Sequence, residues 1–204
     1  DGQIVHLMWA ANYVKSASTL YAVARNVDEM VRAEQYQQEQ QAVLKLISTE
    51  QPVTDIFHRI CQMAESQSKK IRASLRLKSG DKLLLMAAPS FSQRFCTAMA
   101  NLPIADNQGS CGSAAYQKSL VVADDIASDR KWQGIADSLL AEGVKACWSM
   151  PMVSKEEVVL GTFALYCTEA RSIRKDELEL MLTCSRFAAV AIERSEQKRL
   201  LQQS

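Results

Sequence analysis

The chain has 204 residues and a formal net charge of +1, so the sequence predicts neither nucleic acid nor an anionic membrane as its main partner. Hydrophobic residues make up 48% and charged residues 23% of the chain, a composition typical of a globular protein with a substantial core. No apolar run approaches the ~18 residues that a membrane-spanning helix needs. The first residues also lack the pattern of a signal peptide.

The cysteines argue against both a metal site and a disulfide framework. The six cysteines are scattered without a C-x-x-C pair, and the chain has only two histidines. Structural zinc needs clustered Cys and His ligands, so no metal site is expected. We interpret the cysteines as free thiols in a reducing compartment, which predicts a cytoplasmic location.

The N-terminal part predicts a short strand and then a long helix. Residues 3–9 have strand character after the Asp1–Gly2 turn. Residues 15–48 contain neither Pro nor Gly, and an apolar seam recurs there at helical spacing: Leu20, Val23, Val27 and Met30. We assign residues 1–40 to this strand and a linker or signalling helix.

The following segment alternates in a way that predicts an antiparallel hairpin. Pro52 ends the long helix, and Thr54 is a plausible N-cap for the next one. Residues 71–78 alternate strictly between apolar and polar side chains, and 82–88 return as the partner strand. A later apolar run at 158–167 has strand length and is expected in the same sheet.

The order of all the elements indicates the fold class. Helices and strands follow one another as helix, helix, two strands, small helices, strand, helix, two strands and a long final helix at 173–203. This order predicts an α+β fold with a central, mostly antiparallel sheet of five to six strands and helices gathered on one face.

Several motifs then occur in a familiar series. The segments "GSCGSAAYQKSLVVADDI", "GVKACWSMPM" and "VVLGTFALY", followed by "AAVAIER", resemble a bacterial GAF domain in order and spacing. The resemblance covers residues 41–196, and residues 197–204 would start a connector helix. This subtype resembles the GAF domains of cyclic-di-GMP enzymes (GGDEF/EAL type) and also those of histidine kinases. The start, "DGQIVHLMWAA", resembles the last hairpin strand of a PAS domain.

The resemblance implies a regulatory role rather than catalysis. Small helices and loops would cover a pocket on the second face of the sheet, and a small molecule of unknown identity would bind there. Long flanking helices would form a homodimer and control a covalently attached output domain. No cofactor can be named from the sequence.

The glycine-rich turn supplies two candidate ligand-binding residues, Ser110 and Cys111. The resemblance places this turn at the pocket rim, where Gly109 and Gly112 allow a close backbone approach. A helix that starts at Gly112 would offer its free N–H groups to an anionic or carbonyl oxygen. The alternative is a tight turn with a small buried cysteine.

Four further residues complete the candidate set: Asp125, Trp132, Trp148 and Ser149. Asp125 follows a strand end, where an aspartate either caps the next turn or accepts hydrogen bonds from a ligand. In the strand around Trp148, alternation places Cys147 and Ser149 on one face and Trp148 on the other. Either Trp148 or that pair therefore faces the pocket, but not both.

Two other functions compete with sensing. Free methionine-(R)-sulfoxide reductases are similar in fold and also carry a Gly-x-Cys-Gly turn, which would make Cys111 catalytic. Such chemistry needs a resolving cysteine, and the nearest ones, Cys96 and Cys147, lie fifteen and thirty-six residues away in sequence. The spacing therefore favours a pocket-lining Cys111. The third possibility is a dimerisation module whose pocket is filled by side chains.

Overall fold

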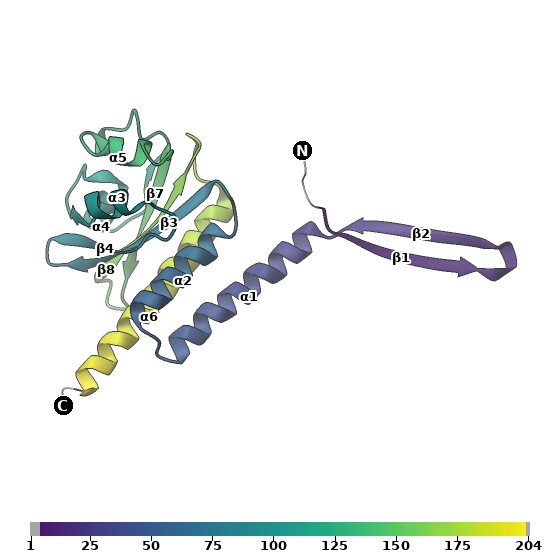
Figure 1. Cartoon of the computed structure of the whole chain (residues 1–204). Coiled ribbons are helices and arrows are strands. Elements are labelled where there is room, and N and C mark those ends of the chain that lie inside the picture. The colour runs from purple at the N-terminus through teal and green to yellow at the C-terminus, as the bar shows by residue number, and fades with distance from the viewer. Residues whose placement is uncertain (1–4, 203–204) are drawn as a thin grey trace. The chain divides into compact units, whose positions relative to one another are not determined.

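The computed structural model describes residues 5–202, and the chain divides into two compact units between Ala42 and Val43. The first unit contains a hairpin of β1 (Leu7–Val14) and β2 (Thr19–Asn26), joined by the short helix η1 (Lys15–Ala17) (Figure 1). Helix α1 (Asp28–Ser48) begins in the first unit and ends in the second.

The predicted helix over residues 15–48 is wrong for its first third. Residues 19–26 form β2, which pairs with β1 in an antiparallel register that matches Leu20 with Tyr13 and Val23 with Ala10. Apolar residues three apart fit a helical face, but the β-branched and aromatic residues of "TLYAV" also favour a strand. Ser18, in the left-handed conformation (φ 49°), turns the chain so that cross-strand pairing replaces helix formation. The Asp1–Gly2 turn lies outside the described residues.

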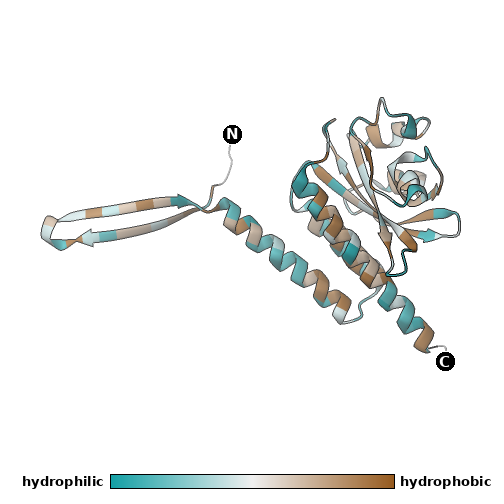
Figure 2. Cartoon of the chain, turned by 180° about the vertical axis from the view of Figure 1, so that it is seen from behind, coloured by the Kyte–Doolittle hydropathy of each residue, from teal (hydrophilic) through white to brown (hydrophobic). Residues whose placement is uncertain are grey.

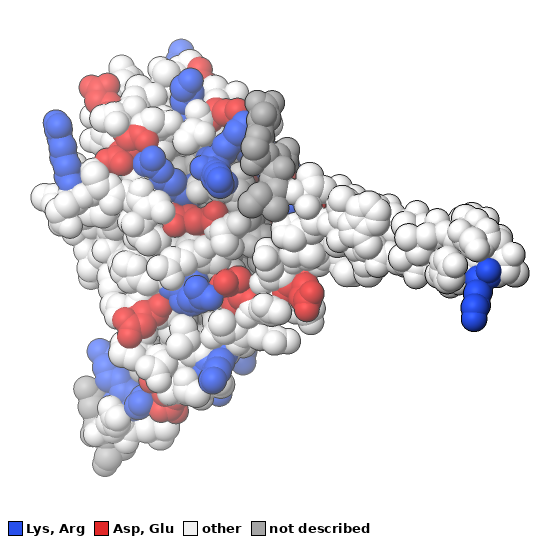
Figure 3. All heavy atoms as spheres, turned by 45° about the vertical axis from the view of Figure 1, so that its right-hand side comes forward, with Lys and Arg blue, Asp and Glu red and all other residues white. Residues whose placement is uncertain are grey.

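One face of this hairpin is apolar along its whole length. The register places Leu7, Trp9 and Tyr13 of β1 on the same face as Leu20 of β2. These side chains are 48–66% exposed, so the hairpin has no core of its own. Hydrophobic colouring along both strands is visible in Figure 2, and Figure 3 shows the hairpin almost without charge.

The second unit is built on a six-stranded antiparallel sheet, which confirms the predicted α+β class. The strand order is β5-β4-β3-β8-β7-β6. The strands are β3 (Ile71–Ser79), β4 (Lys82–Ala87), β5 (Asn101–Pro103), β6 (Val121–Ala123), β7 (Ala146–Val153) and β8 (Val159–Cys167). The predicted hairpin of β3 and β4 is confirmed, and β8 lies beside β3 in the same sheet.

Helices cover both faces of this sheet (Figure 1). One face packs against α2 (Val53–Glu65) and α6 (Lys175–Gln202), whose apolar stripes are buried there. The other face carries the short helices α3 (Gln93–Ala98), α4 (Gly109–Gln117), η2 (Arg130–Trp132) and α5 (Ala136–Leu140). This arrangement places a second hydrophobic cluster between α4 and the sheet.

Helix α2 begins two residues earlier than the predicted N-cap implies. Pro52, not Thr54, occupies its N-cap position, and the Pro52 carbonyl accepts hydrogen bonds from the backbone N–H groups of Asp55 and Ile56. The short edge strand β5 was not predicted, because three residues ending in a proline carry no periodic signal.

Within residues 5–202, no helix is both long enough and apolar enough to cross a membrane. The same described residues contain no group of three or more His, Cys, Asp or Glu side chains arranged to hold a metal ion.

Candidate ligand site

Helix α4 brings three of the candidate residues together on β7. The Ser110 hydroxyl donates to the Cys147 carbonyl at 3.2 Å, and the Cys111 Sγ lies 3.2 Å from the Ser149 Oγ. All of these side chains are buried. The face of β7 that carries Cys147 and Ser149 therefore faces α4, which resolves the alternative left open by strand alternation.

Cys147 joins this group although its sequence distance argued against it. Its Sγ lies 3.8 Å from the same Ser149 Oγ that contacts Cys111. The chain between the two cysteines runs through α4, β6, η2 and α5 before it reaches β7, so spacing in the sequence was a poor guide to spacing in the fold. Alternation along β7 was the signal that placed Cys147 on the same face as Ser149.

Two glycines allow α4 to lie close to its neighbours. The helix begins at Gly109 rather than at the predicted Gly112, and Gly109 has φ +59°, in the left-handed region. A Cβ at Gly109 would lie 3.1 Å from two ring carbons of Trp132. A Cβ at Gly112 would lie 2.5 Å from the Pro103 carbonyl oxygen. The glycines are therefore needed for close packing.

A cavity of about 460 Å³ lies in the loop that follows β6. Of the six candidate residues, only Trp132 lines it. The indole ring is 1% exposed, and its Nε1–H has no hydrogen-bond partner among the described residues. A buried donor without a partner is rare and costs free energy, which makes it a feature to explain. The full lining is Ile126, Ala127, Ser128, Asp129, Arg130, Trp132, Gln133, Gly134, Ala136 and Asp137.

Asp125 lies at the start of this loop and caps it. Its Oδ1 accepts from the Ala127 backbone N–H at 3.1 Å, and its Oδ2 accepts from the Ser128 hydroxyl at 3.0 Å. Both carboxylate oxygens therefore hold the loop in place. Gln133, Gly134, Ala136 and Asp137, which line the cavity beyond Trp132, were not in the predicted set because this stretch carries no motif.

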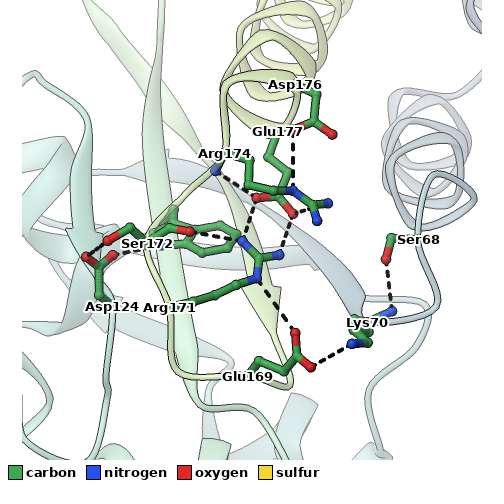
Figure 4. A network of polar contacts seen from close by, with 10 residues as sticks. Ser68, Lys70, Asp124, Glu169, Arg171, Ser172, Arg174, Asp176 and Glu177 are labelled. Carbon is green, nitrogen blue, oxygen red and sulfur yellow. Dashed lines mark hydrogen bonds and ion pairs between the residues drawn. The ribbon is translucent and has the colours of Figure 1, made fainter.

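Trp148 lies on the opposite face of the sheet from Cys111. Its Nε1–H donates to Asp124 Oδ1 at 3.3 Å, and the Arg171 guanidinium lies 5.0 Å from its ring centroid. The structure therefore does not bring Trp148 to the other candidates. Figure 4 shows the polar network beside it, in which Ser172 donates to the other oxygen of Asp124.

Glu177 is the centre of that network. Arg171 donates to both of its carboxylate oxygens, at 2.6 and 2.8 Å, and the Arg174 backbone N–H donates at 2.9 Å. Burial opposes ionisation of Glu177, but the hydrogen bonds from Arg171 and Arg174 outweigh it and lower the pKa of this carboxyl. The network fixes the turn that leads into α6.

Burial also governs the thiols near α4. It raises the pKa of Cys147 well above its ordinary value, and the neighbouring Cys111 acts in the same direction. Burial raises the pKa of Cys96 as well, although this thiol is only partly buried. The site therefore does not favour a thiolate at Cys147 at neutral pH.

The comparison with known families decides what this fold is. A model of the GAF domain matches residues 52–192. The chain belongs to the GAF domain family. The match lies within the boundaries 41–196 expected from the motifs, and the α4 turn with its buried Cys111 belongs to this GAF domain.

Solved structures show the same fold at low sequence identity. The GAF domain of a phosphoenolpyruvate-protein phosphotransferase from Coxiella burnetii aligns with a TM-score of 0.67 and 12% identity, covering 81% of this chain and 96% of its own. A free methionine-R-sulfoxide reductase from Neisseria meningitidis, solved with its substrate, aligns with a TM-score of 0.61 and 14% identity, covering 80% of this chain and 91% of its own. At such identities the likeness shows the fold alone.

A sensor protein is similar in sequence to this GAF domain and the segment before it. The methyl sulfide methyltransferase-associated sensor of Methanosarcina acetivorans is 26% identical over 182 residues. The alignment covers 88% of this chain but only 18% of the sensor. The chain thus spans less than a fifth of its relative's length.

Proposed function

We propose that this GAF domain is a non-catalytic sensory module that binds a small organic molecule in the cavity at residues 126–137. The observation that carries the proposal is Trp132, which lines the cavity and whose buried Nε1–H has no hydrogen-bond partner among the described residues. A ligand with an acceptor oxygen or nitrogen and a flat apolar surface would satisfy this donor and pack on the ring. Ser110, Cys111 and Ser149 would support the wall from behind, through α4.

A cavity-filling variant tests this proposal. Ser128 is exposed and lines the cavity, so Ser128→Trp would occupy the ligand's space without disturbing the core. We expect wild-type protein purified from its source organism to release a small molecule on unfolding and the variant to release none. Gln117→Trp, exposed and outside the cavity, is the matched control and should retain it. Equal release from all three proteins would contradict the assignment of this cavity.

We further propose that the domain forms a homodimer through α6. The predicted seam at residues 20–30 does not form, since Leu20 and Val23 lie in β2. Helix α6 instead exposes Leu182 and Val190, 39% and 43% exposed, beside a groove of about 410 Å³.

The charges around this groove suit a second copy of the same chain. Arg186 and Glu193 both line it, and a two-fold axis would set Arg186 of one copy opposite Glu193 of the other. Val190→Arg should give monomers in sedimentation, whereas Val122→Arg, at a similarly exposed valine on β6, should not. A wild-type protein that stays monomeric at micromolar concentration would contradict this proposal.

The attached output domain is proposed to make or hydrolyse cyclic-di-GMP. The motif resemblance supports this assignment, and the similarity to a much longer sensor supports attachment to further domains. A ligand can control such a domain only if it binds one arrangement of the flanking helices more tightly than another. Measuring cyclic-di-GMP turnover by the full-length protein, with wild-type and Ser128→Trp versions of this domain, tests the proposal. Identical turnover in both would argue against control through this cavity.

A thiol reductase is the second candidate, because one observation favours it. Cys111 and Cys147 contact the same hydroxyl, so a resolving cysteine is nearer than the sequence indicated. Burial of both side chains and the raised pKa of Cys147 weigh against it, since the thiolate is the reactive species. We expect no turnover of free methionine sulfoxide with a thiol reductant. Turnover that Cys111→Ser abolishes would replace the sensor assignment with the enzyme.

A further inference from the structure

Arg76 lies in the core of the GAF domain with most of its hydrogen-bonding groups unused. The side chain is 1% exposed, and its one hydrogen bond runs from Nη1 to the Met99 carbonyl at 2.7 Å. Neither Nε nor Nη2 has a partner among residues 5–202. A guanidinium stays charged at all physiological pH values, and a buried charge without a counter-charge costs several kcal/mol.

No acidic group in the described residues neutralises this charge. Cys147 and Tyr166 sense it electrostatically, but burial raises the pKa of both well above their ordinary values, so both are neutral at pH 7. Glu142 and Arg76 both influence the pKa of Cys96, Glu142 raising it and Arg76 lowering it. The Glu142 carboxylate, however, pairs with Arg72 at 3.2 Å and accepts from the Ser92 hydroxyl. The charge on Arg76 is therefore uncompensated.

A second unused donor lies beside Arg76. Thr162 on β8 is its direct partner in the antiparallel register, so the two side chains point to the same face of the sheet. Thr162 is fully buried, and its Oγ1 has no partner either. Close approach of the strands is built in here, because a Cβ on Gly161 would clash with the Arg76 carbonyl oxygen. Two adjacent buried donors with no acceptor form a site for an acceptor that is not part of the chain.

We propose that Arg76 and Thr162 bind an oxyanion, a carboxylate or a phosphate-type group, inside the GAF domain. Two of its oxygens would accept from Nε and Nη2 in the bidentate geometry that arginine favours, and Thr162 would donate to one of them. The C-terminal end of α3 lies at the site, since the carbonyl of its C-cap residue Met99 accepts from Nη1. The partly exposed Cys96 of the same helix is near enough to Arg76 for the guanidinium to lower the pKa of its thiol. None of these residues lines the cavity at 126–137, so the inference does not depend on the proposed function.

Thermal unfolding in different sodium salts tests the inference. The 204-residue chain is dialysed into chloride and then titrated at constant ionic strength with formate, acetate, phosphate or sulfate. We expect the Tm of the wild type to rise saturably with one class, by roughly 5–10 °C at a hundredfold excess over Kd. A response to formate and acetate alone would identify a carboxylate, and a response to phosphate and sulfate alone would identify a phosphate-type ligand.

Three variants make the result specific to the site. Arg76→Met should remove the salt-specific rise and be at least as stable as the wild type in chloride, because it replaces an uncompensated charge. Thr162→Val should keep the rise with an affinity about tenfold weaker. Ser185→Ala removes another buried hydroxyl without a partner, on α6, and should behave as the wild type.

The proposal is overturned if wild type and Arg76→Met respond alike to every salt. It is also overturned if Arg76→Met unfolds or is strongly destabilised in chloride, since the charge would then already be compensated within the fold. Thr162→Val tests the second residue of the site independently, because an unchanged affinity in this variant would exclude Thr162 from the site.

Discussion

Replacing Gly109 with alanine tests how tightly α4 is fitted against Trp132. Two costs add at this position. An alanine in the left-handed conformation, at φ +59°, costs about 1–2 kcal/mol. The new Cβ would also lie 3.1 Å from the Trp132 ring and 3.3 Å from Ile135 Cδ1, and overpacking of this kind costs about 1–3 kcal/mol. The expected loss in the free energy of unfolding is therefore about 2–5 kcal/mol.

Gly80 provides the matched control for the conformational cost. It has φ +60°, and a Cβ there would meet nothing within 4 Å, so Gly80→Ala should cost only about 1–2 kcal/mol. Urea unfolding followed by far-UV circular dichroism measures both variants. If Gly109→Ala costs no more than Gly80→Ala, then Trp132 is not packed on α4 and the wall of the cavity is not where we place it.

Variants at three other positions address the thiols, the turn before α6 and the loop after β6. Cys96 is the only cysteine that is not fully buried, so the native protein should react quickly with a thiol reagent at one site, and Cys96→Ser should remove that fast phase; a second fast thiol would contradict the burial described. Glu177→Gln should lower the free energy of unfolding at pH 7 by about 3 kcal/mol or more. Because the folded-state pKa of Glu177 is lowered, this contribution is present at neutral pH and lost as pH falls from about 5 toward 2, so the two proteins should converge in acid. Asp125→Ala should cost about 1 kcal/mol by uncapping the loop, and Asp125→Asn should recover most of that; equal losses would refute the capping role.

The sheet of the GAF domain was predictable because its strands carry strong local signals. Strict alternation at 71–78 and the apolar run at 158–167 each identify a strand, and both lie in the sheet. The hairpin at 7–26 was missed because the spacing of its apolar residues fits both the helical repeat of about 3.6 residues and the strand repeat of 2. Only the register with β1 shows that the period of two applies to Leu20 and Val23.

The candidate site was predictable only in part. The glycine-rich turn correctly indicated the start of a helix near Cys111, and alternation correctly separated Trp148 from Ser149. Neither signal reports distances between segments that are remote in sequence, so the contact of Cys111 and Cys147 with one hydroxyl was not foreseen. The unpaired guanidinium of Arg76 was equally hidden, since an arginine in an alternating strand is expected to face solvent.

Native mass spectrometry of the protein purified from its source organism tests the central claim most directly, because it reports bound small molecules and oligomeric state together. We expect a dimer in which each copy carries a non-covalent small-molecule adduct that is lost on unfolding and absent from Ser128→Trp. A wild-type spectrum that contains only the bare chain, without an adduct in any charge state, would contradict the assignment of this GAF domain as a small-molecule sensor.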